Sequence, residues 1–336
     1  MKIHKNLLIL MTAFTCYSMN STFADNYIPA KMVSYEAFPE YTHVDKGVQT
    51  LQTTGNEIAV TYKPNIPYVT RKEGVRNLQL LLPHTRNKPN QNYPLIVYIQ
   101  GSAWLKQDIF INQANLAKFA ARGYAIAIVQ YRESALAPFP AQIQDAKTAI
   151  RFMRIHAEDY HIDTNNIFVW GDSSGGHTAV MTGITENMPE FDTDTYAEYS
   201  ANVNAIVDVF GPTDIRKMNN FPSTWDHREK NSPEGLFIGG NRVPDNEAQA
   251  NKTVIENYIS KNRAIPPVLI LHGTKDRLVS YNQSELLYEK LKETNKDVTM
   301  YRLKGADHGD PAFWSDEVLD KIDNFLQKNI HHGIVK

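Results

Sequence analysis

Three residues that lie far apart along this chain have side chains suited to nucleophilic catalysis. Ser173 is the central residue of GDSSG at 171–175, Asp276 ends HGTKD at 272–276, and His308 lies in KGADHG at 304–309. A serine hydroxyl is a weak nucleophile near neutral pH, so it needs a base within hydrogen-bond reach and a carboxylate that orients this base. The chain offers all three groups, provided that folding brings them together.

The predicted secondary structure gives these three residues a common position. Each follows a short apolar run typical of a buried strand, and in a doubly wound sheet the ligand crevice lies beyond the carboxyl ends of the strands. The order serine, aspartate, histidine is the one found in hydrolases with a nucleophile elbow. The three strands are predicted at residues 167–170, 268–271 and 298–303.

Small residues flank the candidate nucleophile and are also found in one earlier loop. Glycine tolerates a sharp turn, so the GDSSG stretch fits a turn at which strand 167–170 becomes a helix. Nucleophilic attack on a carbonyl also needs backbone N–H donors that face the developing oxyanion. We expect one donor at Ser174 and another in the loop YIQGSAW at 98–104, where Gly101 and Ser102 allow close approach of a substrate.

The rest of the chain alternates strand-like and helix-like segments, which predicts an α/β fold with a mostly parallel sheet covered by helices on both faces. Two early strands without a long helix between them predict an antiparallel edge. Besides the three strands already named, strands are expected at 58–62, 77–82, 95–99, 125–130 and 205–210, and helices around 116–120, 143–153 and 318–326.

The sequence also predicts the organisation of the chain. Residues 1–24 combine Lys2 and Lys5 with a short apolar run and small residues before Ala24, the pattern of a cleaved secretory signal. A membrane anchor is the alternative, but the run is short for a span of about 20 residues. Residues 25–50 are expected to form an N-terminal arm and residues 51–336 a catalytic domain, in which the irregular stretch 211–263 is a candidate lid.

Composition narrows the classes of partner and cofactor. The net charge is −2 and there is no Lys/Arg block, so a nucleic-acid partner is not expected. The single cysteine, Cys16, lies within the predicted signal, which leaves no thiol for a disulfide or metal site in the mature protein. The histidines have no metal-ligand spacing, so we expect no metal and no cofactor. The oligomeric state is not predictable from these features.

Several stretches resemble the α/β-hydrolase serine esterases that are hormone-sensitive-lipase-like in the broad sense. IQGSAW resembles their HGGGW loop, and the stretch from FPAQIQDAKTAI to GDSSGGH is similar to their approach to the nucleophile. PPVLILHGTKDRLVS and GADHG continue the likeness, which covers about 93–325 and is strongest to the branch of acetyl-xylan and feruloyl esterases. The resemblance implies Ser173 as nucleophile, His308 as base, Asp276 as acid, and Gly101, Ser102 and Ser174 around the oxyanion.

The resemblance implies a carboxylesterase that acts on short-chain esters, or on acetyl or feruloyl esters of polysaccharides. The predicted signal adds the expectation that the enzyme is secreted or periplasmic, without a membrane association after signal cleavage. Gln100 stands where the family has histidine, and Ser102 and Ala103 replace glycines. An amidase or peptidase of the same fold, or a hydrolase fold that binds without catalysis, remain alternatives. Asp214 and Asp307 are rivals of Asp276. Candidates for the substrate pocket are Trp104, Tyr281 and Trp314.

Overall fold

The computed structural model describes residues 28–332 of the 336-residue chain. The predicted signal at 1–24 therefore lies outside the described residues. The chain divides into two units between Gln52 and Thr53. In the first unit, residues 28–52 are exposed and contain turns but no helix or strand. The second unit, which starts at Thr53, contains all three candidate catalytic residues.

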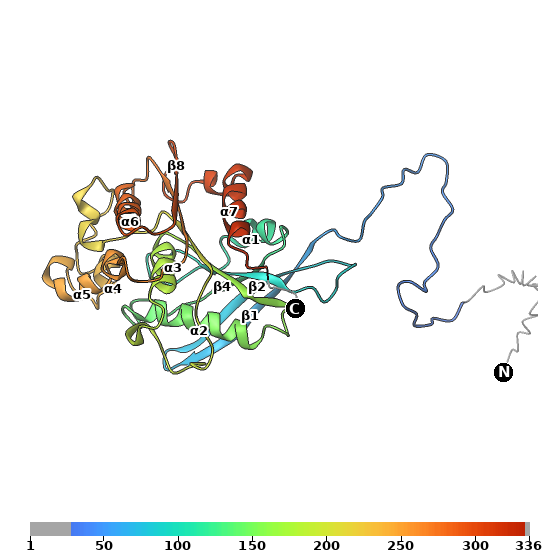
Figure 1. Cartoon of the computed structure of the whole chain (residues 1–336), viewed down its shortest axis with the longest axis horizontal. Helices are drawn as coiled ribbons and strands as arrows, with labels where there is room; N and C mark the ends of the chain where they lie inside the picture. Colours follow the sequence, from blue (N-terminus) through green and yellow to red (C-terminus); the bar gives the residue numbers. More distant parts are fainter. Residues whose placement is uncertain (1–27, 333–336) are drawn as a thin grey trace, which may run out of the picture. The chain divides into compact units, whose positions relative to one another are not determined.

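An eight-stranded sheet organises the second unit and confirms the predicted α/β fold (Figure 1). Its strand order is β1-β2-β4-β3-β5-β6-β7-β8. The hairpin β1–β2 is antiparallel and forms the predicted antiparallel edge, while β3 to β8 run parallel. The strands are β1 (Ala59–Arg71), β2 (Gly74–His84), β3 (Tyr93–Ile99), β4 (Ala125–Val129), β5 (Ile162–Asp172), β6 (Ala205–Val209), β7 (Val268–Gly273) and β8 (Val298–Leu303).

Helices cover both faces of the sheet, as the near-continuous apolar strands predict. One face packs against buried residues of α2, α3 and α6, and the other against buried residues of α1 and α7. The α-helices are α1 (Gln113–Ala120), α2 (Ala141–Ile155), α3 (Ser174–Ile184), α4 (Pro233–Phe237), α5 (Glu247–Lys252), α6 (Asn282–Glu293) and α7 (Asp316–Lys328). The sequence analysis did not identify α6.

The irregular stretch 211–263 forms short helices and loops over the α2–α3 face, among them α4 and α5. Two buried contacts anchor it. Phe237 of α4 stacks on Trp104 with ring centroids 4.1 Å apart. The buried His227 pairs with Glu234 at 2.8 Å, and its Nε2 lies 3.1 Å from the carbonyl oxygen of Leu278 in the loop after β7. The irregular region is thus part of the packed core, and its role as a lid stays a prediction.

Gly175 permits the close packing of α3 against the end of β3. A Cβ atom at this position would overlap the carbonyl oxygen of Ile99. Because that oxygen belongs to backbone, a side-chain rotation cannot relieve the overlap. We expect Gly175→Ala to destabilise the protein by at least about 1–3 kcal/mol, the usual cost of overpacking, measured by chemical denaturation.

Gly74→Ala is the matched control for this substitution. Gly74 is the first residue of β2, directly after the β1–β2 turn, with φ +108°, and open space surrounds the position of its missing Cβ. Alanine there introduces backbone strain without overlap, which costs about 1 kcal/mol. Equal destabilisation by the two variants would show that the packing of α3 on β3 is not as tight as the structure indicates.

Candidate active site

Ser173 lies on a sharp turn between β5 and α3. Its backbone has φ 53° and ψ −127°, in a region that residues other than glycine rarely adopt. The Ser173 N–H donates to the carbonyl oxygen of Val209 at 2.8 Å, which ties the turn to the end of β6. This strained turn presents the Ser173 hydroxyl at the carboxyl edge of the sheet, as the glycine-rich sequence predicts.

His308 and Asp276 come together with Ser173 at this edge. The Nε2 atom of His308 lies 2.9 Å from Ser173 Oγ, and Nδ1 lies 2.7 Å from Asp276 Oδ2. In the resting arrangement the serine hydroxyl donates to Nε2, and the Nδ1–H donates to the carboxylate. The structure thus brings together three residues that lie 135 and 32 positions apart in the sequence.

The surroundings of Asp276 keep its carboxylate ionised. Oδ1 accepts hydrogen bonds from the N–H groups of Leu278 and Val279 at 2.9 and 2.8 Å. Burial alone would raise the pKa of Asp276, but hydrogen bonds from His272 and His308 outweigh burial and hold the pKa well below its usual range. An ionised carboxylate is the form that orients and stabilises a histidine base.

The two rival aspartates have other partners. Asp214 is buried and binds the guanidinium of Arg216 at 2.8 and 2.9 Å. Asp307 accepts from Arg277 Nε at 2.6 Å, and this arginine lowers the pKa of Asp307 to about 2. Asp276 is therefore the aspartate that the structure places against His308.

The backbone N–H groups expected around the oxyanion differ in their present hydrogen-bond acceptors. Ser174 is the first residue of α3, so its N–H has no acceptor within the helix. The Ser102 N–H points to the same turn and donates to Ser174 Oγ at 3.0 Å. The Gly101 N–H instead donates to Asp172 Oδ1 at 3.0 Å, so Ser102 and Ser174 stay the expected donors. Gly101 lets the loop approach the elbow, because a Cβ there would overlap the Asp172 carbonyl oxygen.

The loop at 98–105, which is expected to supply an oxyanion donor (the oxyanion loop), makes a tight turn that sequence alone does not reveal. Ala103 and Trp104 both adopt positive φ, 55° and 53°, and the Leu105 N–H donates to the carbonyl oxygen of Ser102 at 3.0 Å. Two successive left-handed residues usually call for glycine or asparagine. The Ser102 hydroxyl donates to the carbonyl oxygen of Leu105 at 2.7 Å and lies 2.8 Å from Tyr131 Oη, which supports the turn.

Trp104 leaves the active site and enters the core. Its side chain is 1% exposed, stacks on Phe237 and contacts the edge of His177. The expectation that Trp104 lines the substrate pocket is therefore wrong, because the left-handed turn directs the indole into the core between the sheet and α4. The ring instead fixes the loop that carries the Ser102 N–H.

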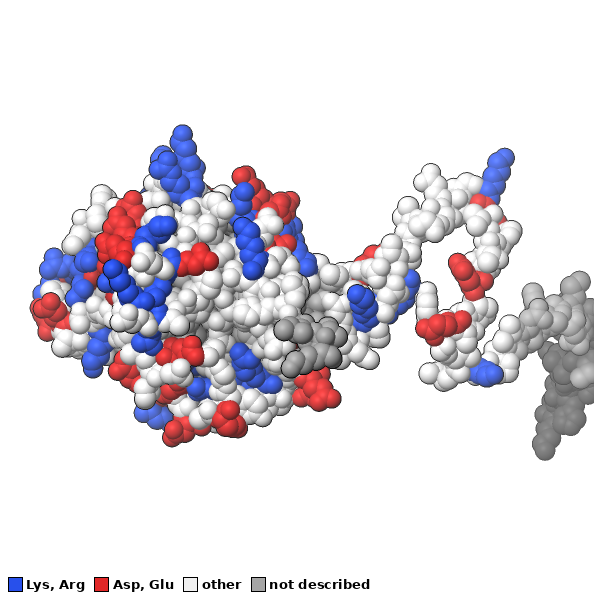
Figure 2. All heavy atoms as spheres, in the orientation of Figure 1, with Lys and Arg blue, Asp and Glu red and all other residues white. Residues whose placement is uncertain are grey.

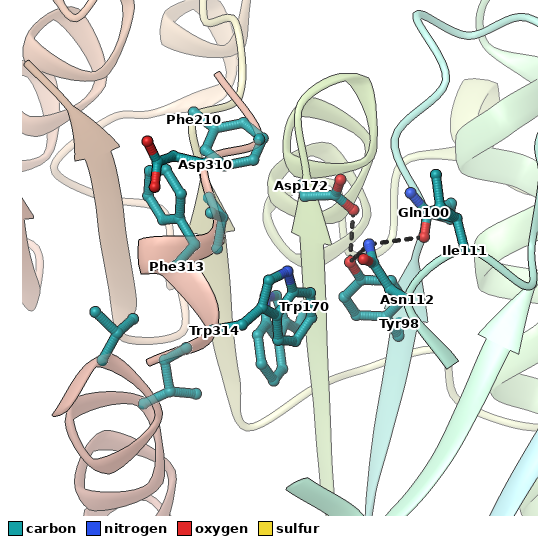
Figure 3. A pocket seen from close by; sticks show the side chains of 14 residues that line it. Tyr98, Gln100, Ile111, Asn112, Trp170, Asp172, Phe210, Asp310, Phe313 and Trp314 are labelled. Carbon is teal, nitrogen blue, oxygen red and sulfur yellow. Dashed lines mark hydrogen bonds between the residues drawn. The ribbon is translucent and has the colours of Figure 1, made fainter. Parts of the chain in front are cut away.

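A cavity of about 170 Å³ lies on the α1–α7 face of the sheet (Figure 3). We use the name triad for Ser173, His308 and Asp276. The cavity is adjacent to the triad because Asp172 precedes Ser173, Gly309 follows His308, and the Phe210 ring centroid lies 4.5 Å from that of His308. Aromatic side chains form much of its wall, namely Trp170, Phe210, Phe313 and Trp314. Trp314 lines a cavity as expected, whereas Tyr281 packs at 5.6 Å against the buried ring of His272 and does not line this one.

Polar groups occupy one side of this cavity (Figure 3). Tyr98 Oη donates to Asp172 Oδ1 at 2.7 Å, and the amide of Asn112 donates to Tyr98 Oη and to Gln100 Oε1 at 3.0 Å each. Burial raises the pKa of Asp172, although the hydrogen bonds from Tyr98 and Gly101 oppose this rise. Tyr98, Asn112 and Asp172 were not among the site residues predicted from the sequence. The alternation of side chains along a strand could have indicated two of them, because it places Tyr98 of β3 and Asp172 of β5 on the same face of the sheet.

A second buried carboxyl near the elbow has consequences for stability. Asp208, on β6, is 1% exposed and accepts a hydrogen bond from the Gly211 N–H at 3.1 Å. Burial raises the pKa of Asp208 to about 7, whereas an unfolded aspartate titrates near 3.9. Between about pH 4 and pH 7 the folded state thus holds a proton that the unfolded chain has lost, so stability falls as pH rises.

We expect Asp208→Asn to remove this pH dependence. The amide is neutral throughout, and its oxygen still accepts from Gly211. The free energy of unfolding of the wild type should fall relative to the variant by roughly 2–4 kcal/mol between pH 4 and pH 8, as measured by urea denaturation at several pH values. A constant difference between the two proteins over that range would contradict the assignment.

The described residues have a surface of mixed charge, with neither a group of metal ligands nor a membrane-spanning helix. On the face of the second unit shown in Figure 2, Lys and Arg are interspersed with Asp and Glu. Within residues 28–332, no three histidine, cysteine or acidic side chains are grouped so as to hold a metal ion. Over the same residues, no helix combines the length and apolar character needed to cross a bilayer.

The fold and the hydrogen-bonded Ser-His-Asp arrangement define an α/β hydrolase of the serine type. Residues 78–291 match the family model BD-FAE, so the chain belongs to the BD-FAE family of α/β-hydrolase esterases. The resemblance to hormone-sensitive-lipase-like serine esterases is confirmed by this match.

Curated relatives and solved structures agree with this family. Esterase LipC of Mycobacterium tuberculosis is 25% identical over 241 residues, which are 67% of this chain and 55% of LipC. A probable isoprenylcysteine alpha-carbonyl methylesterase of Arabidopsis thaliana is 23% identical over 271 residues, 78% of this chain and 55% of that protein. The chain spans about half the length of LipC and of the other curated mycobacterial esterases that it matches.

A truncated carbohydrate esterase from gut microbiota has a TM-score of 0.71 and 27% identity, over 82% of this chain and 98% of that one. A bifunctional GH43-CE protein of Bacteroides eggerthii has a TM-score of 0.69 and 29% identity, over 83% and 39% of the two chains. A propionate-bound esterase of Thermogutta terrifontis, at 22% identity and a TM-score of 0.62 over 80% and 94%, shares the fold.

Proposed function

We propose that this protein hydrolyses carboxylic esters through an acyl-enzyme formed on Ser173. The observation that carries the proposal is the continuous hydrogen-bonded series from Ser173 Oγ through His308 to Asp276, with distances of 2.9 and 2.7 Å. Membership in a family of esterases supports the same reaction. These three side chains are the catalytic residues of the proposal.

In the proposed reaction, Ser173 Oγ attacks the ester carbonyl carbon while His308 Nε2 takes the hydroxyl proton. The oxyanion that forms accepts hydrogen bonds from backbone N–H groups, for which Ser174 and Ser102 are the candidates. The Ser102 N–H would exchange its present acceptor, Ser174 Oγ, for the oxyanion. His308 then protonates the leaving alcohol, and a water molecule activated by His308 releases the acid and restores Ser173.

For the substrate we propose an acyl ester of a carbohydrate, either acetyl or hydroxycinnamoyl. The carbohydrate esterase from gut microbiota supports the carbohydrate part, since it aligns over 98% of its own chain. The cavity beside the triad supports a ring-sized acyl group, because cavities of about 150 Å³ can bind benzene and this one measures about 170 Å³. Its aromatic walls suit stacking against a planar ring.

Labelling with a fluorophosphonate tests the catalytic assignment directly. Such a probe forms a covalent bond with an activated serine only. We expect the wild type to take up one label, on Ser173, and Ser173→Ala to take up none. Ser174→Ala is the matched control, because it removes the neighbouring hydroxyl but retains the backbone N–H, so it should still be labelled. Labelling of Ser173→Ala at the wild-type rate would refute the proposal.

A substrate panel tests the acyl specificity. We expect activity on acetylated or feruloylated xylan, and we expect Trp314→Ala to lower kcat/KM for a feruloyl ester more than for an acetyl ester, because the indole forms part of the cavity wall. Higher activity on peptide or amide substrates than on every ester would instead assign the chain to the amidase class. If Trp314→Ala lowered kcat/KM by the same factor for both esters, the cavity would not be the site that recognises the acyl group.

We also propose that the protein is exported to the periplasm or the medium after cleavage following Ala24. The support is the sequence of residues 1–24, with its basic start, short apolar run and small residues before the cleavage position. N-terminal sequencing of the protein secreted by its host tests this, and we expect the mature chain to begin at Asp25. A protein that retains Met1 and stays with the membrane would point to an anchor.

A further inference from the structure

The carboxylate of Asp276 binds a second imidazole besides that of His308. His272, near the end of β7, has no exposed surface, and its Nε2 lies 3.2 Å from Asp276 Oδ2. The same carboxylate oxygen lies 2.7 Å from His308 Nδ1. Since Oδ1 accepts hydrogen bonds from two backbone N–H groups, Oδ2 is the oxygen that both imidazoles approach.

The neighbours of His272 define its tautomer. Nε2 faces two acceptors, Asp276 Oδ2 and the carbonyl oxygen of Val279 at 2.9 Å, so it carries the hydrogen. Nδ1 lies 2.7 Å from Ser284 Oγ on α6, and the serine hydroxyl donates to it. Hydrogen bonds therefore join Ser284 to His272, and Asp276 through His308 to Ser173, while the 3.2 Å approach of His272 Nε2 to Asp276 Oδ2 lies between the two series.

We propose that His272 is a positioning residue for the triad, which holds Asp276 Oδ2 in line with His308 and moderates the negative charge that His308 meets. This inference rests on the proposed ester hydrolysis. A nearby N–H dipole such as that of His272 Nε2, 3.2 Å from Oδ2, partly offsets the negative charge that the carboxylate presents to His308. His272 thus limits how strongly Asp276 stabilises the imidazolium of His308, which must lose its proton in each cycle.

The other groups around the two imidazoles are also defined. The rings of Phe210 and Tyr281 pack against His272 at 6.5 and 5.6 Å. Phe210 also packs against His308, and the carboxyl of Asp172, on the opposite side of the elbow, interacts electrostatically with His308. Asp307 precedes His308 and is paired with Arg277. None of the charged groups among them is removed when His272 is replaced, and the Ser284→Ala variant described below leaves the imidazole and its aromatic neighbours in place.

The first test replaces His272 by leucine and by glutamine. We expect His272→Leu to lower kcat for p-nitrophenyl acetate by about 10- to 100-fold with little change in KM. The rise of kcat on the acid side of its pH–rate profile (the acidic limb) should move to higher pH. Without the N–H of His272 beside it, the Asp276 carboxylate stabilises the His308 imidazolium more strongly. Glutamine presents an N–H near the place of Nε2, so His272→Gln should recover most of kcat and the wild-type limb.

The second test acts at a distance from the triad and covers the case in which His272→Leu fails to fold. Ser284→Ala removes the hydroxyl that fixes His272, whereas Ser280→Ala removes a buried hydroxyl that has no hydrogen-bond partner. We expect a several-fold lower kcat and a shifted limb for Ser284→Ala and wild-type behaviour for Ser280→Ala.

Two results would overturn the proposal: unchanged pH profiles in folded His272→Leu and Ser284→Ala, or equal effects of the two serine substitutions. Fluorophosphonate labelling of Ser173 distinguishes this failure from failure of the proposed function. A wild type that is labelled and active while the His272 variants behave normally refutes the positioning role alone.

Discussion

Replacing Ser173 with alanine is expected to lower kcat for an activated ester such as p-nitrophenyl acetate by about 10⁶-fold. Alanine has no atom that can form the acyl-enzyme, so only the oxyanion donors and substrate binding remain to accelerate direct attack by water. The measurement is initial-rate kinetics on purified protein. The folded state should persist, since the hydroxyl of Ser173 contacts His308 at the protein edge and is not part of the core.

Ser174→Ala provides the comparison for this result. The Ser174 hydroxyl accepts a hydrogen bond from the Ser102 N–H, so its loss should change the oxyanion loop and lower kcat far less than loss of the nucleophile does. If Ser173→Ala kept more than about one per cent of the wild-type kcat, Ser173 would not be the nucleophile.

Replacing Asp276 with asparagine should have the second largest effect, a loss of about 10⁴-fold in kcat. Asparagine is nearly isosteric with aspartate, but its amide group can present N–H to His308 Nδ1. Histidine would then carry its hydrogen on Nε2, where it cannot accept the proton of Ser173. The pH–rate profile of Asp276→Asn, measured from pH 5 to pH 10, should show partial recovery at high pH.

Asp307→Asn is the matched substitution for this prediction. Asp307 immediately precedes His308 and pairs with the exposed Arg277 instead of the imidazole. We expect its kcat to change by less than about tenfold, the range of surface ion pairs. If Asp307→Asn lowered kcat more than Asp276→Asn did, Asp307 would be the aspartate that orients His308.

Much of the fold was predictable because the strands of a parallel sheet covered on both faces consist of nearly continuous apolar residues. Residues 205–210 and 298–303, for example, are expected as strands and form β6 and β8, with one residue of difference at the end of β6. Helix α6 escaped prediction because it is largely polar, with Leu287 and Leu291 as its buried apolar residues. The hairpin strands β1 and β2 extend beyond their predicted ends, because pairing between neighbours lengthens strands whose own sequence is mixed.

The meeting of Ser173, Asp276 and His308 was predictable from their positions after parallel strands. The oxyanion loop was not, because its path depends on two residues, Ala103 and Trp104, that adopt a conformation which their side chains disfavour. Tertiary contacts such as the Trp104–Phe237 stack maintain that conformation, and they involve residues more than 130 positions apart. For the same reason the sequence did not distinguish a substrate-facing tryptophan from a buried one.

The second imidazole on Asp276 was also missed, although His272 is visible in HGTKD. Its sequence position, four residues before the acid, does not indicate whether its ring faces the carboxylate or the core. The turn after β7 decides this, because hydrogen bonds from Leu278 and Val279 to Asp276 fold the chain back over His272. Contacts of this kind depend on loop geometry more than on residue type.

The stacked pair Trp104–Phe237 also bears on how substrates reach Ser173. For the stretch 211–263 to swing open as a hinged flap, Phe237 would have to leave a fully buried site, and exposing such a ring costs about 3 kcal/mol or more. An opened form at that energy would make up less than about one per cent of the molecules. If Ser173 hydrolyses esters, substrates must therefore reach it without this movement, so the rate should not jump at an oil–water interface as it does for lipases that need a flap to open.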